Sequence, residues 1–169
     1  EALAKSKRPL ILAGHGAMIS RADDTLLAFA EKAQIPVTST LLGKGVFPET
    51  HALALGMLGM HGTAYANKAI CECVVAAVRC LDGPAVVGGD WNMQPATLAK
   101  TGFLGMIKGT IFAPELPTCN GKVFDFFVVT NNFSHAVVGV QRIDGVGMSP
   151  HFPVRLLLRG DARRFCVRT

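Results

Sequence analysis

The sequence lacks several features that would place it in a specialised class of protein. No apolar run approaches the roughly 18 residues that a membrane-spanning helix needs. Only 17% of the 169 residues are charged and 50% are hydrophobic, which argues against general disorder and predicts a packed core. The chain begins without a signal- or transit-peptide pattern, because its basic residues lead into a short apolar run that ends in glycine. We therefore expect an intracellular, cytoplasmic protein without a membrane partner.

The cysteines also lack the pattern of a metal site or a disulfide framework. There are five of them, an odd number, and the close pair Cys71 and Cys73 has no matching second pair. A structural zinc site is therefore not expected, and reduced thiols fit an intracellular setting. The net charge of +5 is compatible with anionic ligands but does not by itself indicate nucleic acid.

What the first half does contain is a strand–helix–strand pattern. The apolar run "RPLILAG" (residues 8–14) predicts a buried strand, and "IPVTST" (residues 35–40) predicts another, rich in β-branched residues. Between them, "SRADDTLLAFAEKAQ" predicts a helix, with Ser20 and Asp23 spaced as a capping box. Its core-facing stripe is expected to comprise Leu26, Leu27, Ala30 and Ala33. Two strands joined by a helix imply parallel pairing with a right-handed crossover.

This arrangement predicts a ligand site at one edge of the sheet. Ligands of open parallel sheets bind beyond the carboxyl ends of the strands. The segments there are residues 14–16, residues 40–43 and the glycine-rich stretch "GMLGMHGTAYAN", which leads into a helix predicted near residues 63–69. Amides exposed at a helix start favour an anion such as a phosphate. Two interpretations remain open, since the glycines could allow a nucleotide-like ligand to approach the backbone or could simply shape loops.

The stretches "KRPLILAGHGAMIS" and "IPVTSTLLGKGVFPETHALALGMLGMHGTAYAN" closely resemble the central domain of acetolactate synthase, a thiamine-diphosphate enzyme, over about residues 5–70. In that family the domain is Rossmann-like and binds a largely structural FAD, and the enzymes are transferases of branched-chain amino acid biosynthesis. The resemblance implies FAD, or a related nucleotide-like small molecule, as the ligand. The implied contacts are Gly14, Gly16, Thr40, Leu41, Met60, His61, Gly62 and Thr63.

The resemblance does not extend to catalysis. Thiamine diphosphate and magnesium bind in two other domains of a complete family member, and their motifs do not occur here. Gly89-Asp90 followed by Asn131-Asn132 is a decoy, because Trp91 stands where the metal motif needs glycine. The next strand of the family corresponds at best to the degraded run "AAVRCLD", residues 76–82. We therefore expect the chain not to catalyse the family's reaction alone.

The second half follows a different pattern. The runs "GPAVVGGD", "KVFDFFVVT", "AVVGVQRID" and "PVRLLLRG" predict strands, and Pro95 is placed to open a short helix. Asp125 interrupts the most apolar of these strands, where a charge is costly unless it is paired or bound to metal. Asp90, Asn92, Asp125 and His151 could converge around a divalent ion and a phosphodiester.

The order of these groups resembles the carboxyl-terminal part of the endonuclease/exonuclease/phosphatase superfamily, over about residues 83–158. The resemblance rests on Gly-Asp-Trp-Asn at residues 89–92, Phe-Asp-Phe-Phe at 124–127 and Ser-Pro-His-Phe-Pro-Val at 149–154. It implies Mg²⁺ or Mn²⁺ as cofactor, His151 as catalytic histidine, Asp90 and Asn92 as phosphate-positioning groups and Asp125 as their support. Nucleic acid would be a partner only under this interpretation. Pro150 replaces the superfamily's aspartate, and the glutamate that holds the metal has no counterpart, so a degenerate site is expected.

Together these patterns predict an α/β chain with two parts. Residues 1–75 are expected to form a truncated, partial Rossmann-like parallel βαβ unit. Residues 76–169 are expected to form a mixed α/β, strand-rich fragment of endonuclease/exonuclease/phosphatase type. Three functions remain open: an FAD-binding central-domain segment, a metal-dependent phosphodiesterase, and an inactive fusion. Truncated sheets leave unpaired edges, which predict self-association.

Overall fold

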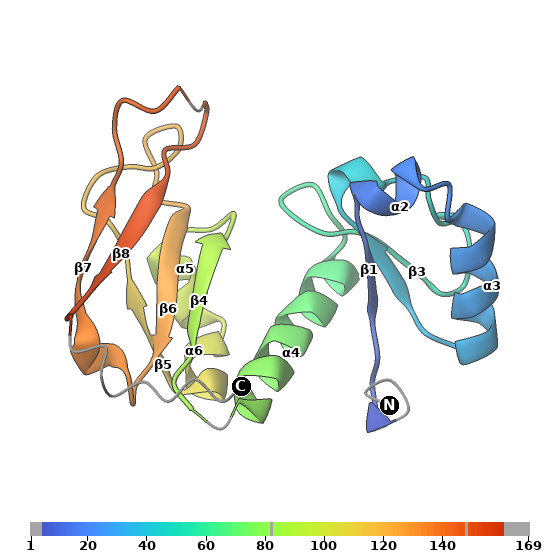
Figure 1. Ribbon diagram of the computed structural model, residues 1–169, viewed down its shortest axis with the longest axis horizontal. Coiled ribbons are helices and arrows are strands. Elements are labelled where there is room, and N and C mark those ends of the chain that lie inside the picture. The colour runs from blue at the N-terminus through green and yellow to red at the C-terminus, as the bar shows by residue number, and fades with distance from the viewer. Residues whose placement is uncertain (1–4, 82, 148, 161–169) are drawn as a thin grey trace. The chain divides into compact units, whose positions relative to one another are not determined.

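The computed structural model describes residues 5–81, 83–147 and 149–160. The chain divides into two compact units, Glu1–Ala76 and Ala77–Thr169. Each unit combines helices with β-sheet structure of its own (Figure 1). Within the described residues, no helix has the length and apolarity needed to cross a membrane.

The first unit is built on a parallel three-stranded sheet. Its strands are β1 (Ile11–Ala13), β2 (Val37–Ser39) and β3 (Ala54–Met57), in the order β1-β2-β3. Both pairings are parallel, with Ile11 opposite Val37 and Val37 opposite Ala54. The predicted parallel pairing of the first two strands is therefore confirmed, and β3 is a third strand that the sequence patterns did not indicate.

Helices lie between these strands and after the last of them. They are α2 (His15–Ile19), α3 (Asp23–Ala33), the short 3₁₀ helix η1 (Leu41–Gly43) and α4 (Ala64–Cys80), and α3 packs against the sheet. The core between the sheet and α3, which lie side by side in Figure 1, comprises Ala13, Ala30, Val37, Val46 and Phe47, with Leu26 and Leu27 packed against it. Three of the four predicted stripe residues are confirmed, but Ala33 is exposed because it is the last residue of the helix.

The predicted capping box at the start of α3 is wrong. Ser20 ends the preceding helix α2, and its hydroxyl donates to the Ala17 carbonyl. The N-cap of α3 is Ala22, which has no side-chain capping bond. Asp23 and Asp24 do lie in the first turn, where their charges favour the positive end of the helix dipole.

The prediction of a degraded strand over residues 76–82 is also wrong where the structure describes them, because helix α4 continues to Cys80. Val75 and Val78 are buried while Ala76 and Ala77 between them are exposed. Burial at a spacing of three is helical, and it does not match the alternation of a strand. Asp82 lies outside the described residues.

The described part of the second unit contains two antiparallel sheets. One has the order β4-β6-β5, with β4 (Val86–Asp90), β5 (Gly109–Phe112) and β6 (Asp125–Thr130). The other pairs β7 (Val137–Arg142) with β8 (Val154–Leu158). The remaining elements are α5 (Pro95–Lys100), α6 (Phe103–Ile107) and η2 (Ser134–Ala136). The four predicted strands and the helix opened by Pro95 are confirmed, and β5 was not anticipated.

Among the described residues, each three-stranded sheet has edge strands that pair on one side only. In the first unit these are β1 and β3, and in the second they are β4 and β5. Unpaired edges present free backbone groups that can pair with another chain. Self-association through these edges stays a prediction.

Candidate functional sites

The first candidate site is the edge where the three parallel strands of the first unit end. The Thr40 N–H donates to the Ala13 carbonyl at 3.0 Å, and the Leu58 N–H donates to the Ser39 carbonyl at 3.1 Å. Each bond joins the residue that follows one strand to the last residue of the strand before it: the first reaches the end of β1, and the second reaches the end of β2. The edge therefore carries the predicted residues Gly14 and Gly16 after β1, Thr40 and Leu41 after β2, and Met60 to Thr63 after β3.

The turn after β2 is fixed by Thr40 and Gly43. Thr40 is the N-cap of η1, and its side-chain oxygen accepts the Gly43 N–H at 3.2 Å. A Cβ atom on Gly43 would lie 2.3 Å from the Ala13 carbonyl oxygen, so only glycine fits where the ends of β1 and β2 meet. Leu41 points outward and is 70% exposed.

The glycine-rich loop after β3 is explained by its internal packing. Gly56 has φ +82°, a conformation that favours glycine, and a Cβ on Gly62 would lie 2.2 Å from the Met57 carbonyl oxygen. The Asn67 amide both accepts from the Gly59 N–H, at 2.8 Å, and donates to the Gly59 carbonyl, at 2.9 Å. Thr63 adds a hydroxyl bond to the Leu55 carbonyl. These internal contacts account for the glycines as residues that shape the loop.

Two predicted contact residues of this loop are available to a ligand. Met60 is 65% exposed, and the His61 side chain is exposed as well. Helix α4 begins directly after Thr63, so the positive end of its dipole lies next to the loop.

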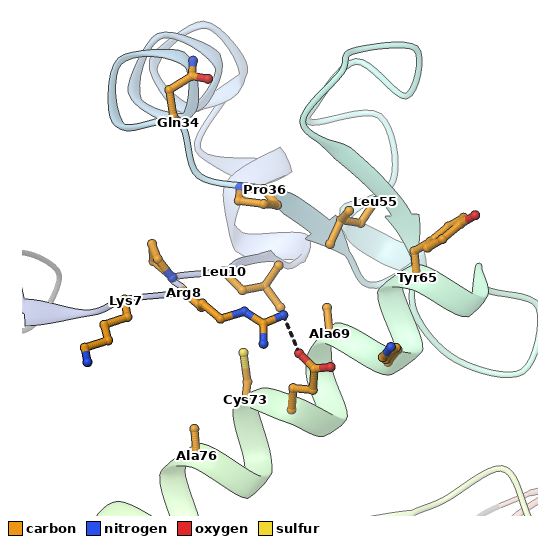
Figure 2. Close-up of a pocket in the computed structure, with 13 residues that line it drawn as sticks. Lys7, Arg8, Leu10, Gln34, Pro36, Leu55, Tyr65, Ala69, Cys73 and Ala76 are labelled. Carbon is orange, nitrogen blue, oxygen red and sulfur yellow. Dashed lines mark ion pairs between the residues drawn. The ribbon is translucent and has the colours of Figure 1, made fainter.

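A cavity of about 600 Å³ lies elsewhere in the first unit, and sequence reasoning did not anticipate it. Figure 2 shows it between α4 and the segments that precede β1 and β2, with Arg8, Pro36 and Tyr65 among its lining residues. The Arg8 guanidinium forms an ion pair with Glu72 at 2.8 Å across this space. None of the predicted cofactor contacts lines the cavity, so it is distinct from the carboxyl edge of the sheet.

The Cys71 thiol, on α4, has a displaced pKa. Partial burial raises the pKa of Cys71, and the negative charge of the adjacent Glu72 raises it further. A raised thiol pKa lowers the fraction of reactive thiolate, so Cys71 does not have the character of a nucleophile.

The second candidate site lies in the second unit, where three predicted residues come together. Asp90, at the end of β4, is directly opposite Asp125, at the start of β6. His151 lies against both, with its Nδ1 atom 2.8 Å from Asp125 Oδ2 and its Nε2 atom 3.9 Å from Asp90 Oδ2. One ligand atom from each residue falls within 4.8 Å of the others.

The charges of these three side chains account for their arrangement. Two carboxylates directly opposite each other on neighbouring strands repel unless a positive group lies between them. His151 can supply that charge when both of its nitrogens carry protons. With a neutral ring, Asp125 would hold the proton on Nδ1 and leave the Nε2 lone pair facing Asp90. That is the usual arrangement of a histidine that ligates a metal or accepts a proton.

Asn92, the fourth predicted residue, is placed beside this cluster. It has φ +49°, and its backbone N–H donates to Asp90 Oδ1 at 2.9 Å, which fixes one oxygen of that carboxylate. Trp91 packs under the turn, stacked on Phe126 at 5.4 Å, and its ring N–H donates to the Phe126 carbonyl at 3.0 Å. The structure therefore brings Asp90, Asp125 and His151 together, and Asn92 contacts Asp90 through its backbone.

The comparisons with known proteins concern the first half of the chain. Residues 1–78 match the family described as thiamine pyrophosphate enzyme, central domain. The N-terminal part of this chain is thus similar to the central domain of thiamine pyrophosphate enzymes.

The relatives themselves are acetolactate synthase large subunits. The chain is 55% identical over 87 residues to a probable acetolactate synthase large subunit of Methanocaldococcus jannaschii, which covers 51% of this chain and 15% of the relative. It is 56% identical over 69 residues to that of Parasynechococcus marenigrum, covering 41% of this chain and 11% of the relative. It is 55% identical over 71 residues to that of Cyanidium caldarium, covering 42% and 12%. The chain therefore spans only about an eighth of these relatives' length. The resemblance of residues 83–158 to the endonuclease/exonuclease/phosphatase superfamily stays a prediction.

Proposed function

We propose that the first unit binds FAD, or a related nucleotide, at the carboxyl edge of its parallel sheet. The observation that carries this proposal is the convergence of the three strand ends, each of which supplies predicted contacts to the same edge. Open parallel sheets bind ligands at this edge. The same residues lie within the segment that matches the acetolactate synthase large subunits.

The chemistry of the edge fits such a ligand. The exposed side chains of Leu41 and Met60 offer apolar surface for a flat ring system. The start of α4 and the loop before it offer the positive end of a helix dipole for a pyrophosphate. In this proposal FAD is structural, and thiamine diphosphate and magnesium are cofactors only of a complete family member. We therefore expect no acetolactate formation by these 169 residues alone.

Replacing His61 with alanine is expected to weaken FAD binding about tenfold while leaving the melting temperature unchanged. The side chain is exposed, so its loss costs little stability, whereas a lost ligand contact worth about 1.4 kcal/mol is a factor of ten in affinity. The measurement is a titration of FAD fluorescence with purified protein. His135→Ala, which removes a histidine from the second unit, is the matched control and should bind FAD like the wild type. If both variants bind FAD with equal affinity, His61 does not contact the ligand.

We also propose a second function for the second unit, a divalent-metal site of the kind that cleaves phosphodiesters. The observation that favours it is the meeting of Asp90, Asp125 and His151. Carboxylate oxygens and an imidazole nitrogen suit Mn²⁺, and carboxylates suit Mg²⁺. A bound ion would polarise a phosphoryl oxygen, Asp90 and His151 would hold it, and Asp125 would orient the imidazole. Because Pro150 replaces an aspartate, weak activity is expected.

Asp125→Asn is expected to reduce Mn²⁺ affinity at least about tenfold and to abolish any Mn²⁺-dependent cleavage of a nitrophenyl phosphodiester. The substitution removes one negative charge and the group that orients His151. Binding is measured by water-proton relaxation. The control is Glu115→Gln, which neutralises an exposed carboxylate of the same unit outside the cluster. If the wild-type protein binds Mn²⁺ no better than Asp125→Asn does, the metal site is refuted, and with it the proposed phosphodiesterase function of this unit.

A further inference from the structure

The loop before β6 is organised around one buried side chain, Thr118, which is 0% exposed. Its hydroxyl oxygen accepts two backbone N–H groups, from Phe124 at 2.9 Å and from Asp125 at 3.1 Å. Its own N–H donates to the Lys122 carbonyl at 2.8 Å, which closes the loop. The position at which Asp125 enters β6 is therefore set by Thr118.

Thr118 also holds the segment that carries His151. Its carbonyl accepts the Phe152 N–H at 2.8 Å, and the next residue, Cys119, forms a β-bridge with His151. Asp125 and His151 are 26 residues apart in the sequence. Thr118 thus bonds directly to the backbone of one of them and to the neighbour of the other.

Arg142 ties the same two segments together a second time. Its Nη1 donates to the Pro117 carbonyl at 2.7 Å, and its guanidinium lies 4.4 Å from the centre of the Phe152 ring. Nη2 pairs with Asp144 at 2.7 Å. A cation over an aromatic face is attracted by the ring, so this contact holds Phe152 in place beside His151.

We propose that Thr118 and Arg142 are positioning residues that set the geometry of the Asp125–His151 pair. The inference rests on the second function proposed above, to which it adds the residues that assemble the site. Neither residue belongs to the cluster itself. Each acts through backbone groups next to the two side chains that meet, and a short hydrogen bond between side chains on separate segments requires both backbones to be held.

The test uses the imidazole ¹⁵N and Nδ1–H resonances of His151 in the whole chain, which report its hydrogen bond to Asp125 without needing a metal or a substrate. Thr118→Val keeps the shape but removes the acceptor of two N–H groups. We expect it to lose or strongly shift the Nδ1–H resonance and to weaken Mn²⁺ binding about tenfold. Thr118→Ser keeps the oxygen, and we expect the wild-type resonance and Mn²⁺ affinity within about twofold.

Two further variants provide a control and an alternative to Thr118→Val. Thr110→Val is the matched control, because Thr110 bonds an exposed Asn131 side chain of the same unit at 2.8 Å, and its His151 resonance should be unchanged. Should Thr118→Val fail to fold, Arg142→Gln decides, since it removes the Phe152 contact and is expected to shift the same resonance.

A folded Thr118→Val protein, or a folded Arg142→Gln protein if Thr118→Val does not fold, with the wild-type His151 resonance would overturn the inference. A wild type that shows the Nδ1–H resonance but binds no Mn²⁺ would refute the metal-site function alone, and the variants' resonances would still decide the positioning roles.

Discussion

Replacing Phe126 with alanine should lower the free energy of unfolding of the second unit by about 3–5 kcal/mol. Phe126 is 0% exposed and stacks on Trp91, so the truncation opens a cavity and removes an aromatic contact. The chain has a single tryptophan, and it is this one, so urea unfolding followed by tryptophan fluorescence reports directly on the unit.

The control for this substitution is Leu116→Ala, at a residue of the same unit that is 52% exposed. A surface truncation of this kind is expected to change the free energy of unfolding by no more than about 0.5 kcal/mol. Equal losses in the two variants would mean that Phe126 is not the centre of the packing that supports the Asp90 turn.

Gly62→Ala is the second substitution with a large expected effect. Its Cβ would lie 2.2 Å from the Met57 carbonyl oxygen and 2.7 Å from the Leu58 carbonyl carbon, so the backbone of the loop must move. Forcing atoms into a packed position costs about 1–3 kcal/mol. A displaced loop also moves Met60 and His61, and FAD affinity should therefore fall together with the melting temperature.

Gly16→Ala provides a matched control at the same edge of the sheet. A Cβ atom on Gly16 would meet nothing within 4 Å, and the residue is in helix α2, where alanine is favoured over glycine. The variant should therefore melt at or slightly above the wild-type temperature. A Gly62→Ala protein as stable as Gly16→Ala would contradict the packing that the structure assigns to the loop.

The sequence predicted the elements whose pattern is local and strong. Period-two or continuous apolar runs identified β1, β2 and the four strands β4, β6, β7 and β8, and the spacing of Leu26 and Ala30 identified α3. The two missed strands, β3 and β5, are four residues long and each contains a glycine, so neither has a clear pattern of its own. Both are held as strands by their pairing partners.

Two other predictions failed because a local pattern had a competing interpretation. Ser20 and Asp23 have capping-box spacing, yet Ser20 ends helix α2. That helix was not recognised in the sequence because of the glycines at residues 14 and 16. The run at residues 76–82 was matched to a strand through the family resemblance, but the valines at positions 75 and 78 bury one face of helix α4, which continues to Cys80.

For the candidate sites as well, the sequence indicated the residue types of the site, but it did not indicate contacts between residues that lie far apart in the chain. The meeting of Asp90, Asp125 and His151 was anticipated from their residue types, because a carboxylate within an apolar strand needs a partner. The part played by Thr118 could not be anticipated. A threonine in a loop has no distinctive pattern, and its importance depends on bonds to residues that only the fold brings near.

A thermal melt of the whole chain with and without FAD tests most directly the proposal that the carboxyl edge of the parallel sheet binds FAD. A ligand that binds only the native state stabilises it by about 2.7 kcal/mol at a hundredfold excess over its dissociation constant. We expect a cooperative transition that moves to higher temperature as FAD is added, with a smaller shift for His61→Ala. A transition that stays at the same temperature at saturating FAD would contradict the claim.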